Sequence, residues 1–216
     1  MVLPGRICPN AQPVTLGNGF PDVAASGLRL PLSVTQMSVS VSQTLLHMIE
    51  HGDHRVMDRV HSWRAPQWVR WWMICATRGG DGWLWYSLFA LLLVLGDDAR
   101  FVAVGAASIA ASVGIALFVL LKRICNRTRP CHIRAHCWAN LLPPDRFSFP
   151  SGHTITAFAV STPLWMVYPS LALPLLFCAI SVAASRVVLG MHFLSDVLAG
   201  TAIGVTLGYA TISLLN

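Results

Sequence analysis

The longest uncharged stretch of this sequence is an apolar run from Phe101 to Leu121, and it limits what the chain can fold into. The run holds 21 residues without a charge. As a helix rising about 1.5 Å per residue it is about 31 Å long, enough to cross the hydrocarbon core of a bilayer. The whole chain is 55% hydrophobic and only 11% charged, which is too apolar for an ordinary soluble protein. The sequence therefore predicts an integral membrane protein.

Further apolar segments predict additional helices at 83–95, 154–168, 171–185 and 193–215. The last three are separated by Pro169 and by a break from Gly190 to His192. Upstream, residues 45–77 mix charges with tryptophans, which suits helices lying in the membrane interface; a soluble hairpin packed on the bundle is the alternative. We therefore expect an all-α integral membrane bundle of about five to six spans with an amphipathic interfacial N-terminal region.

Domain organisation follows from the same pattern. Residues 1–40, with several prolines and glycines, predict a disordered N-terminal tail. Residues 41–216 form the membrane domain, and a polar loop at 122–153 interrupts it. Six of the fifteen positive residues lie between Lys122 and Arg146, opposed there only by Asp145. This local excess indicates an anionic ligand, although anionic lipid headgroups attract arginines as well.

Three clusters of polar residues border the predicted spans, and the alternation of the spans places all of them at one membrane face. The cations are Lys122, Arg129 and Arg186. Several ionisable groups at one membrane depth are costly and need a joint reason, and a bound phosphate supplies one. Lysine gives a point charge and arginine gives forked donors to its oxygens. Any single arginine could instead be a juxtamembrane anchor.

Two histidines stand among these clusters. His192 and Asp196 are four residues apart, so a helix would place them on one face. An aspartate that accepts a proton from one ring nitrogen leaves the other nitrogen available as a nucleophile. His153 follows Ser151 and Gly152 in a stretch typical of a helix N-terminus, where a serine can cap and backbone N–H groups can bind an anion.

The spacing of these residues forms three motifs. Lys122 is followed after six residues by Arg129-Pro130, the second motif is Pro150-Ser151-Gly152-His153, and Ser185-Arg186 is followed after five residues by His192 and after three more by Asp196. Together they resemble the signature motifs of the type 2 phosphatidic acid phosphatase superfamily, with every motif position matched.

The resemblance implies a role for each motif residue. The residues that hold the phosphate would be Lys122, Arg129, Ser151, Gly152 and Arg186. His192 would attack phosphorus, and Asp196 would orient it. His153 would donate a proton to the leaving oxygen and then help water to break the phosphohistidine. Ser185 would make a supporting contact, and no metal or other cofactor would be required.

The resemblance also implies a lipid phosphate as substrate, a bilayer as surroundings, and no nucleic acid partner. Isoprenoid diphosphates are favoured, while phosphatidic acid, phosphatidylglycerol phosphate and lipid A phosphates stay open, as does the oligomeric state. A phosphotransferase would share the phosphohistidine. The family places the site on the extracytoplasmic face of a bacterial inner membrane. The positive-inside count favours the cytoplasmic face, mainly through Arg55, Arg59, Arg64, Arg70 and Arg78.

Other patterns point elsewhere. The stretch from His47 to His51 fits the H-x-x-E-H motif of zinc peptidases, with His47 and His51 as ligands and Glu50 as base, but no third ligand is evident. The pairs Cys131-His132 and His136-Cys137 have zinc-binding residue types without a common zinc spacing. A disulfide among Cys125, Cys131 and Cys137 is a further alternative.

Two alternative functions would use the same motifs. Vanadium haloperoxidases share the superfamily's site but are soluble, and a lipid-binding protein with a decayed site is a non-enzymatic alternative.

Overall fold

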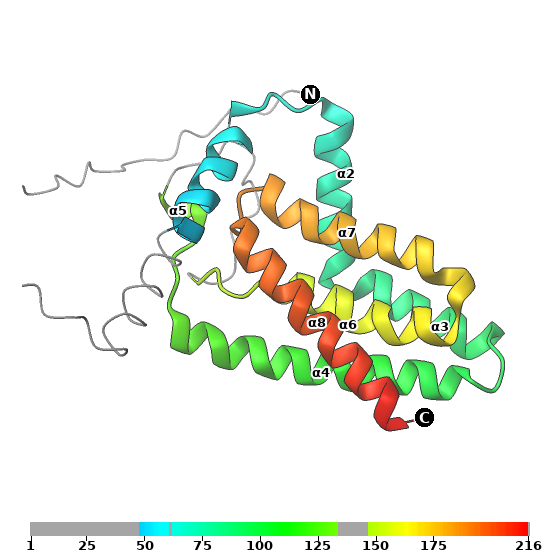
Figure 1. Ribbon diagram of the computed structural model, residues 1–216. Coiled ribbons are helices and arrows are strands. Elements are labelled where there is room, and N and C mark those ends of the chain that lie inside the picture. The colour runs from blue at the N-terminus through cyan, green and yellow to red at the C-terminus, as the bar shows by residue number, and fades with distance from the viewer. Residues whose placement is uncertain (1–47, 61, 134–146, 216) are drawn as a thin grey trace, which may run out of the picture. The chain divides into compact units, whose positions relative to one another are not determined.

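A computed structural model of the chain describes residues 48–60, 62–133 and 147–215 (Figure 1). Residues 48–60 are helical. The helices that follow are α2 (Gln67–Arg78), η1 (Gly79–Trp83), α3 (Leu84–Leu95), α4 (Arg100–Cys125), α5 (Pro130–Ile133), α6 (Gly152–Val167), η2 (Pro169–Leu171), α7 (Ala172–Val188) and α8 (Leu194–Leu215). Within these ranges the only β contact is an isolated antiparallel bridge between Thr128 and Phe147. The all-α prediction is confirmed there, and the tail predicted at 1–40 lies outside the described residues.

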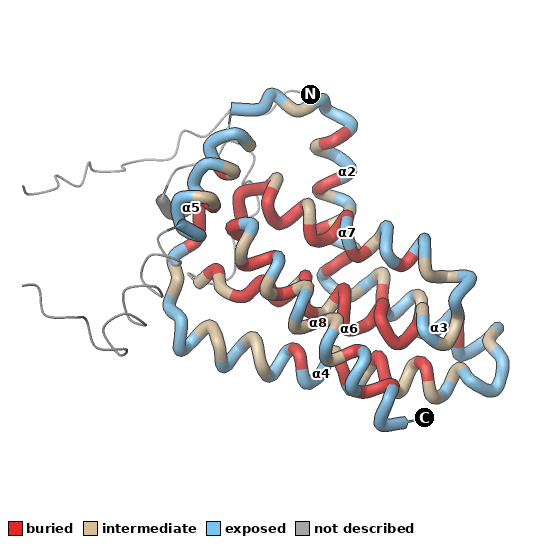
Figure 2. Tube along the Cα trace, in the orientation of Figure 1, coloured by how far each residue is buried: buried red, intermediate tan, exposed pale blue. Residues whose placement is uncertain are grey.

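Helix α6 is the centre of the bundle. It contacts α4, α7 and α8, and it is buried over most of its length (Figure 2). Two of its buried hydroxyls have partners: Thr162 donates to the Phe158 carbonyl at 2.7 Å, and Thr154 donates to the Ser151 hydroxyl at 2.9 Å. The polar atoms of these two residues therefore cost little in an apolar core. The surrounding helices instead turn large apolar side chains such as Val94 and Leu173 outward, as a bilayer environment requires.

Three of the described helical segments are long and apolar enough to cross a membrane: Arg100–Cys125, Pro169–Val188 and Leu194–Leu215. By contrast, α3 has 12 residues and α6 has 16, fewer than the roughly 20 that a spanning helix usually needs. The five to six spans therefore stay a prediction. The amphipathic interfacial region does too, although residues 48–60 and α2 are helical and α2 exposes Trp68 and Trp71.

A stripe of glycines lets α8 approach α6 closely. Gly200, Gly204 and Gly208 repeat every four residues and face α6; a Cβ atom at Gly204 would lie 2.6 Å from the Ile155 carbonyl oxygen. Small residues at this spacing are a common means of packing helices in membranes. Only glycine fits, so the stripe sets the position of α6 relative to α8.

The chain turns sharply at two glycines near the ends of helices. α7 ends at Val188, and Gly190 has a φ of 69°, which confirms the predicted break between Arg186 and His192. Between α2 and α3, η1 is a π-helical turn in which Gly82 has a φ of 124°. Such π turns are frequent at functional sites, and this one brings α2 and α3 to the end of the bundle where the motif residues lie.

Candidate active site

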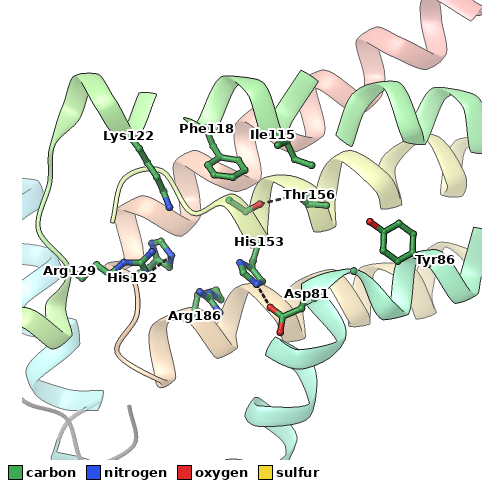
Figure 3. Close-up of a pocket in the computed structure, with 13 residues that line it drawn as sticks. Asp81, Tyr86, Ile115, Phe118, Lys122, Arg129, His153, Thr156, Arg186 and His192 are labelled. Carbon is green, nitrogen blue, oxygen red and sulfur yellow. Dashed lines mark hydrogen bonds and ion pairs between the residues drawn. The ribbon is translucent and has the colours of Figure 1, made fainter. Parts of the chain in front are cut away.

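The ends of α4, α6, α7 and α8 meet around a cavity of about 320 Å³ (Figure 3). Its polar wall carries most of the residues singled out in the sequence: Lys122, Arg129, Gly152, His153, Arg186 and His192. The predicted convergence of these helix ends is therefore present. The rest of the lining comes from η1, α3 and the middle of α4 and α6: Gly80, Asp81, Gly82, Tyr86, Ile115, Phe118 and Thr156.

The hydrogen-bond partners of His192 define its tautomer. Its Nδ1 lies 2.6 Å from the Ser148 carbonyl oxygen, and its Nε2 lies 3.2 Å from Nη1 of Arg129. A carbonyl can only accept a hydrogen bond and a guanidinium can only donate one. The ring therefore carries its proton on Nδ1 and directs the lone pair of Nε2 toward Arg129 at the cavity wall.

Burial lowers the pKa of His192 to about 3; the charges of Arg186 and Arg129 lower it as well, while the nearby carboxylate of Asp196 opposes them. The side chain is only 1% exposed. At neutral pH the imidazole is therefore uncharged, which is the form that can act as a nucleophile.

Asp196 lies beside His192, but not through the shared helix face that the sequence predicted. His192 lies two residues before α8 begins, so the two side chains do not share a helix face. Oδ2 of Asp196 is 3.7 Å from Nδ1 of His192 and accepts from the Phe193 backbone N–H at 2.9 Å. The Ser148 carbonyl is the closer partner of the ring, and the Asp196 carboxylate is a second, longer contact that favours the protonated ring.

The other oxygen of Asp196 belongs to a network centred on Arg127. The Arg127 guanidinium donates to Oδ1 of Asp196, to the Ser195 hydroxyl and to Oδ2 of Asp53, each at 2.7 Å. Asp53 comes from the helical segment 48–60 and is 4% exposed. It also accepts from the Ser195 backbone N–H at 2.9 Å. This network ties the segment 48–60 to the start of α8.

His153 lies in the first turn of α6, and its Nε2 is 2.7 Å from Oδ1 of Asp81 (Figure 3, dashed line). Since a carboxylate only accepts, Nε2 carries a proton. Burial lowers the pKa of His153 to about 4, and the charge of Arg186 adds to this effect, while the bond to Asp81 opposes it. Asp81 thus favours the protonated form of a ring that the rest of its surroundings keep neutral.

The three cations approach the cavity from different elements. Arg129 is 1% exposed and donates to the Met191 carbonyl at 3.1 Å. Arg186, near the end of α7, donates to the Thr77 hydroxyl of α2. Lys122 extends over the Phe118 ring, with Nζ 5.2 Å from its centroid. Together with the N-terminus of α6, they suit a tetrahedral anion with several charged oxygens.

Two predicted serines lie behind the cavity wall. Ser151 is at the N-cap position of α6 but makes no side-chain capping bond, so the predicted cap is wrong in that respect. Its hydroxyl instead accepts from Thr154 at 2.9 Å, and its backbone N–H donates to the Asp196 carbonyl at 3.2 Å. The Ser185 hydroxyl donates to the Val182 carbonyl within α7.

The alternative metal and disulfide predictions fall partly on residues outside the described ranges. His47, His136 and Cys137 are among them. Among the residues that the structure describes, no group of three His, Cys, Asp or Glu side chains is placed to hold a metal ion. The zinc patterns and the loop disulfide therefore stay untested.

The sequence of this chain matches the model of a known protein family. The model of the PAP2 superfamily matches residues 102–216, which are 115 of the 216 residues. The chain belongs to the PAP2 superfamily. The resemblance inferred from the three motifs is thereby confirmed, and the chain is a membrane phosphatase of the PAP2 type.

Curated relatives support the same assignment. The decaprenylphosphoryl-5-phosphoribose phosphatase of Mycobacterium tuberculosis is 33% identical over 127 residues, covering 59% of this chain and 68% of the relative. The lipid A 1-phosphatase of Rhizobium etli is 36% identical over 89 residues, covering 39% of this chain and 38% of the relative.

Solved structures show the same PAP2 fold. The transmembrane PAP2-type phosphatidylglycerolphosphate phosphatase from Bacillus subtilis superposes with a TM-score of 0.60 at 23% identity, covering 77% of this chain and 86% of the other. LpxE of Aquifex aeolicus superposes with a TM-score of 0.61 at 25% identity, covering 74% and 93%. With three segments long enough to span, the chain is an integral membrane protein.

Several lining residues were not found from the sequence. Asp81 is the most notable, because it contacts His153 from an element that precedes the three motifs. Its one signal was a carboxylate set among Gly79, Gly80 and Gly82 at the start of an apolar run. Tyr86 and Phe118 gave no signal, since each stands in an apolar helix among many similar residues.

Proposed function

We propose that this PAP2 protein hydrolyses the phosphate of a lipid through a phosphohistidine on His192, on the extracytoplasmic face of a bacterial inner membrane. The observation that carries the proposal is the tautomer of His192. Its Nε2 lone pair borders a cavity whose wall also holds Lys122, Arg129 and Arg186. A neutral nucleophile beside three cations suits attack on a phosphate whose oxygens those cations bind.

In the first step, Nε2 of His192 attacks phosphorus and the bond from phosphorus to the leaving oxygen breaks. The leaving oxygen takes a proton from the imidazolium of His153, which becomes neutral. The proton of His192 stays on Nδ1 and keeps its hydrogen bond to the Ser148 carbonyl, and the charge of Asp196 stabilises the positive ring that forms. Arg129 exchanges its contact with Nε2 for contacts with the phosphate oxygens.

In the second step, water attacks the phosphohistidine and the bond from nitrogen to phosphorus breaks. Neutral His153 accepts a proton from this water and becomes the imidazolium again. Inorganic phosphate leaves, and His192 returns to its neutral form with the electron pair on Nε2. The cations bind equatorial oxygens in both steps, so the same wall serves both transition states.

A lipid substrate is favoured by the composition of the cavity. Ile115, Phe118 and Tyr86 add apolar surface to the lining of the cavity, and α4 is one of the helices long and apolar enough to cross a membrane. The tail of a lipid can therefore stay in the bilayer while its phosphate reaches the cations. The names of the curated relatives, for decaprenylphosphoryl-5-phosphoribose and for lipid A, also point to phosphates carried by lipids.

The nucleophile is tested with the variant His192→Ala in purified full-length protein. We expect the turnover of a radiolabelled lipid phosphate to fall by about 10⁴-fold or more. Rapid quenching at alkaline pH, where phosphohistidine survives, should trap label on the wild-type protein and none on the variant. A folded variant that retains turnover near the wild-type value would refute the assignment.

A matched control is His51→Ala, which changes a histidine of the segment 48–60 that does not line the cavity. We expect its turnover to equal that of the wild type, with and without a chelator. Loss of activity in this variant together with chelator sensitivity would favour the zinc alternative. Phosphate release that depends on an acceptor other than water would favour a phosphotransferase.

A further inference from the structure

The cavity has distinct environments on the two sides of His153. In Figure 3, His192 lies on one side of His153, and Asp81 and Tyr86 lie on the other. The nucleophile and the leaving group of a phosphoryl transfer are roughly in line on opposite sides of phosphorus. If His192 attacks as proposed, the leaving group therefore departs toward Asp81.

Asp81 is held in this position by its own backbone. η1 carries glycines at 79, 80 and 82, and a Cβ atom at Gly80 would lie 2.9 Å from a Val182 methyl and 3.4 Å from the His153 ring. Gly80 is thus packed against α7 and His153 without room for a larger residue. Oδ2 of Asp81 is 4.0 Å from Arg78, and Oδ1 bonds to His153. The bond to His153 therefore places the carboxylate in the wall that the leaving group meets.

A carboxylate at this place has opposite effects on two classes of substrate. A phosphomonoester releases an alcohol, which is a poor leaving group and needs a proton from the imidazolium that Asp81 stabilises. A diphosphate releases a phosphate, which is a good leaving group but brings negative charge toward the carboxylate. Like charges at close range repel, and with its side chain 42% exposed Asp81 is screened by water only in part. In the proposed function, the cations of the polar wall bind the phosphate that is attacked.

We propose that Asp81 makes this enzyme selective for lipid phosphomonoesters with an uncharged alcohol as leaving group, and that it disfavours lipid diphosphates. This inference rests on the proposed phosphohistidine function. The Nε2–H of the His153 imidazolium keeps its hydrogen bond to Asp81. The proton on the other ring nitrogen moves to the leaving oxygen as the bond from oxygen to phosphorus breaks. His153 is then the neutral ring seen in the structure, whose Nε2–H donates a hydrogen bond to Asp81. Isoprenoid diphosphates, favoured from the sequence, become poorer substrates.

The test compares Asp81→Asn with the wild type on dodecyl phosphate and dodecyl diphosphate, which share one tail. We expect kcat/KM for dodecyl phosphate to fall by about tenfold or more, because acid catalysis weakens. We expect kcat/KM for the diphosphate to be unchanged or to rise. p-Nitrophenyl phosphate, a monoester with a good leaving group, should lose less than about threefold. Equal losses on all three substrates would overturn the proposal.

Further variants separate a catalytic effect from a structural one. Asp81→Glu keeps the charge and should show more of the preference for the monoester than Asp81→Asn does. If Asp81→Asn folds poorly, Asp81→Ser replaces it in the same comparison. Asp98→Asn changes an exposed carboxylate outside the cavity lining and should keep the wild-type preference. A wild-type protein that prefers the diphosphate would refute the inference while leaving the phosphohistidine intact. A wild-type protein that hydrolyses neither lipid would refute the proposed function itself.

Discussion

Two imidazoles with the same chemistry receive different partners at this site. His192 bonds to the Ser148 carbonyl on one side and to Arg129 on the other, an arrangement compatible only with its neutral form. His153 bonds to Asp81, which tolerates both the neutral and the protonated form. The choice between a carbonyl and a carboxylate as partner thus separates the proposed nucleophile from the proposed acid. The motifs alone do not reveal this difference.

The pKa values of the two rings predict how activity depends on pH. His192 is protonated only near pH 3 and His153 only near pH 4, so His192 stays competent at pH 5. At neutral pH His153 is neutral, and the proton for the leaving oxygen must arrive with a singly charged phosphate. Phosphomonoesters lose that proton near pH 6. We expect kcat/KM for a lipid phosphomonoester to be level near pH 5 and to fall above about pH 6 to 7.

This profile is measured with wild-type protein in detergent, with thermal unfolding at each pH as the control for stability. p-Nitrophenyl phosphate should show a weaker decline, because its leaving group needs less help from an acid. A kcat/KM for the lipid monoester that rises steadily from pH 7 to pH 9 would contradict the assignment of His153.

At the scale of elements, the geometry of the site depends on how α6 and α8 pack. α6 carries His153 in its first turn, and α8 begins two residues after His192. The glycine stripe holds the two helices together, and the bond from the Ser151 N–H to the Asp196 carbonyl joins their N-terminal ends. The packing of α6 against α8 therefore sets the distance between the rings of His153 and His192.

The substitution Gly204→Val tests that dependence. Its side chain would enter space where a Cβ already lies 2.6 Å from the Ile155 carbonyl oxygen and 2.9 Å from the Phe158 Cβ. Both contacts involve groups that cannot move aside, so the helices must separate. We expect a loss of stability of about 2–4 kcal/mol and a fall in kcat with little change in cavity chemistry.

Thermal unfolding and kcat in detergent measure both effects. Gly105→Val, on α4, is the matched control, because a Cβ there meets nothing within 4 Å. Stability and kcat of Gly204→Val equal to those of the control would show that the close packing of α6 and α8 is not needed.

For the whole molecule, the sequence predicted the helices more reliably than the contacts between them. Long apolar runs marked α4, α7 and α8 because a bilayer imposes both length and composition. Three spaced motifs located the polar wall. The wall made by η1 and α3 was missed because it depends on a π turn and on Asp81, which no periodic pattern marks. Ser148 could not be foreseen either, since it contributes its backbone and its residue type is immaterial.

Orientation in the membrane is a property of the whole chain and can be tested directly. α4 has 26 residues and is about 39 Å long, so Asp98 before it and Arg123 near its end lie at opposite faces. Both are exposed. With the six native cysteines replaced, we expect a membrane-impermeant thiol reagent to label Arg123→Cys in intact cells and Asp98→Cys only after lysis. The reverse pattern would place the cavity on the cytoplasmic face, as the positive-inside count favours.

The hydrogen bond from His192 to the Ser148 carbonyl has an evolutionary consequence. Every amino acid offers the same main-chain oxygen, so exchanging the residue at 148 does not delete the acceptor. What keeps the acceptor in place is the path of the loop, which is pinned where the Ser148 N–H donates to the Arg127 carbonyl at 2.7 Å. Point mutations at this codon are thereby buffered, whereas an insertion or deletion between Thr128 and Ser148 is the kind of genetic change that can displace the acceptor.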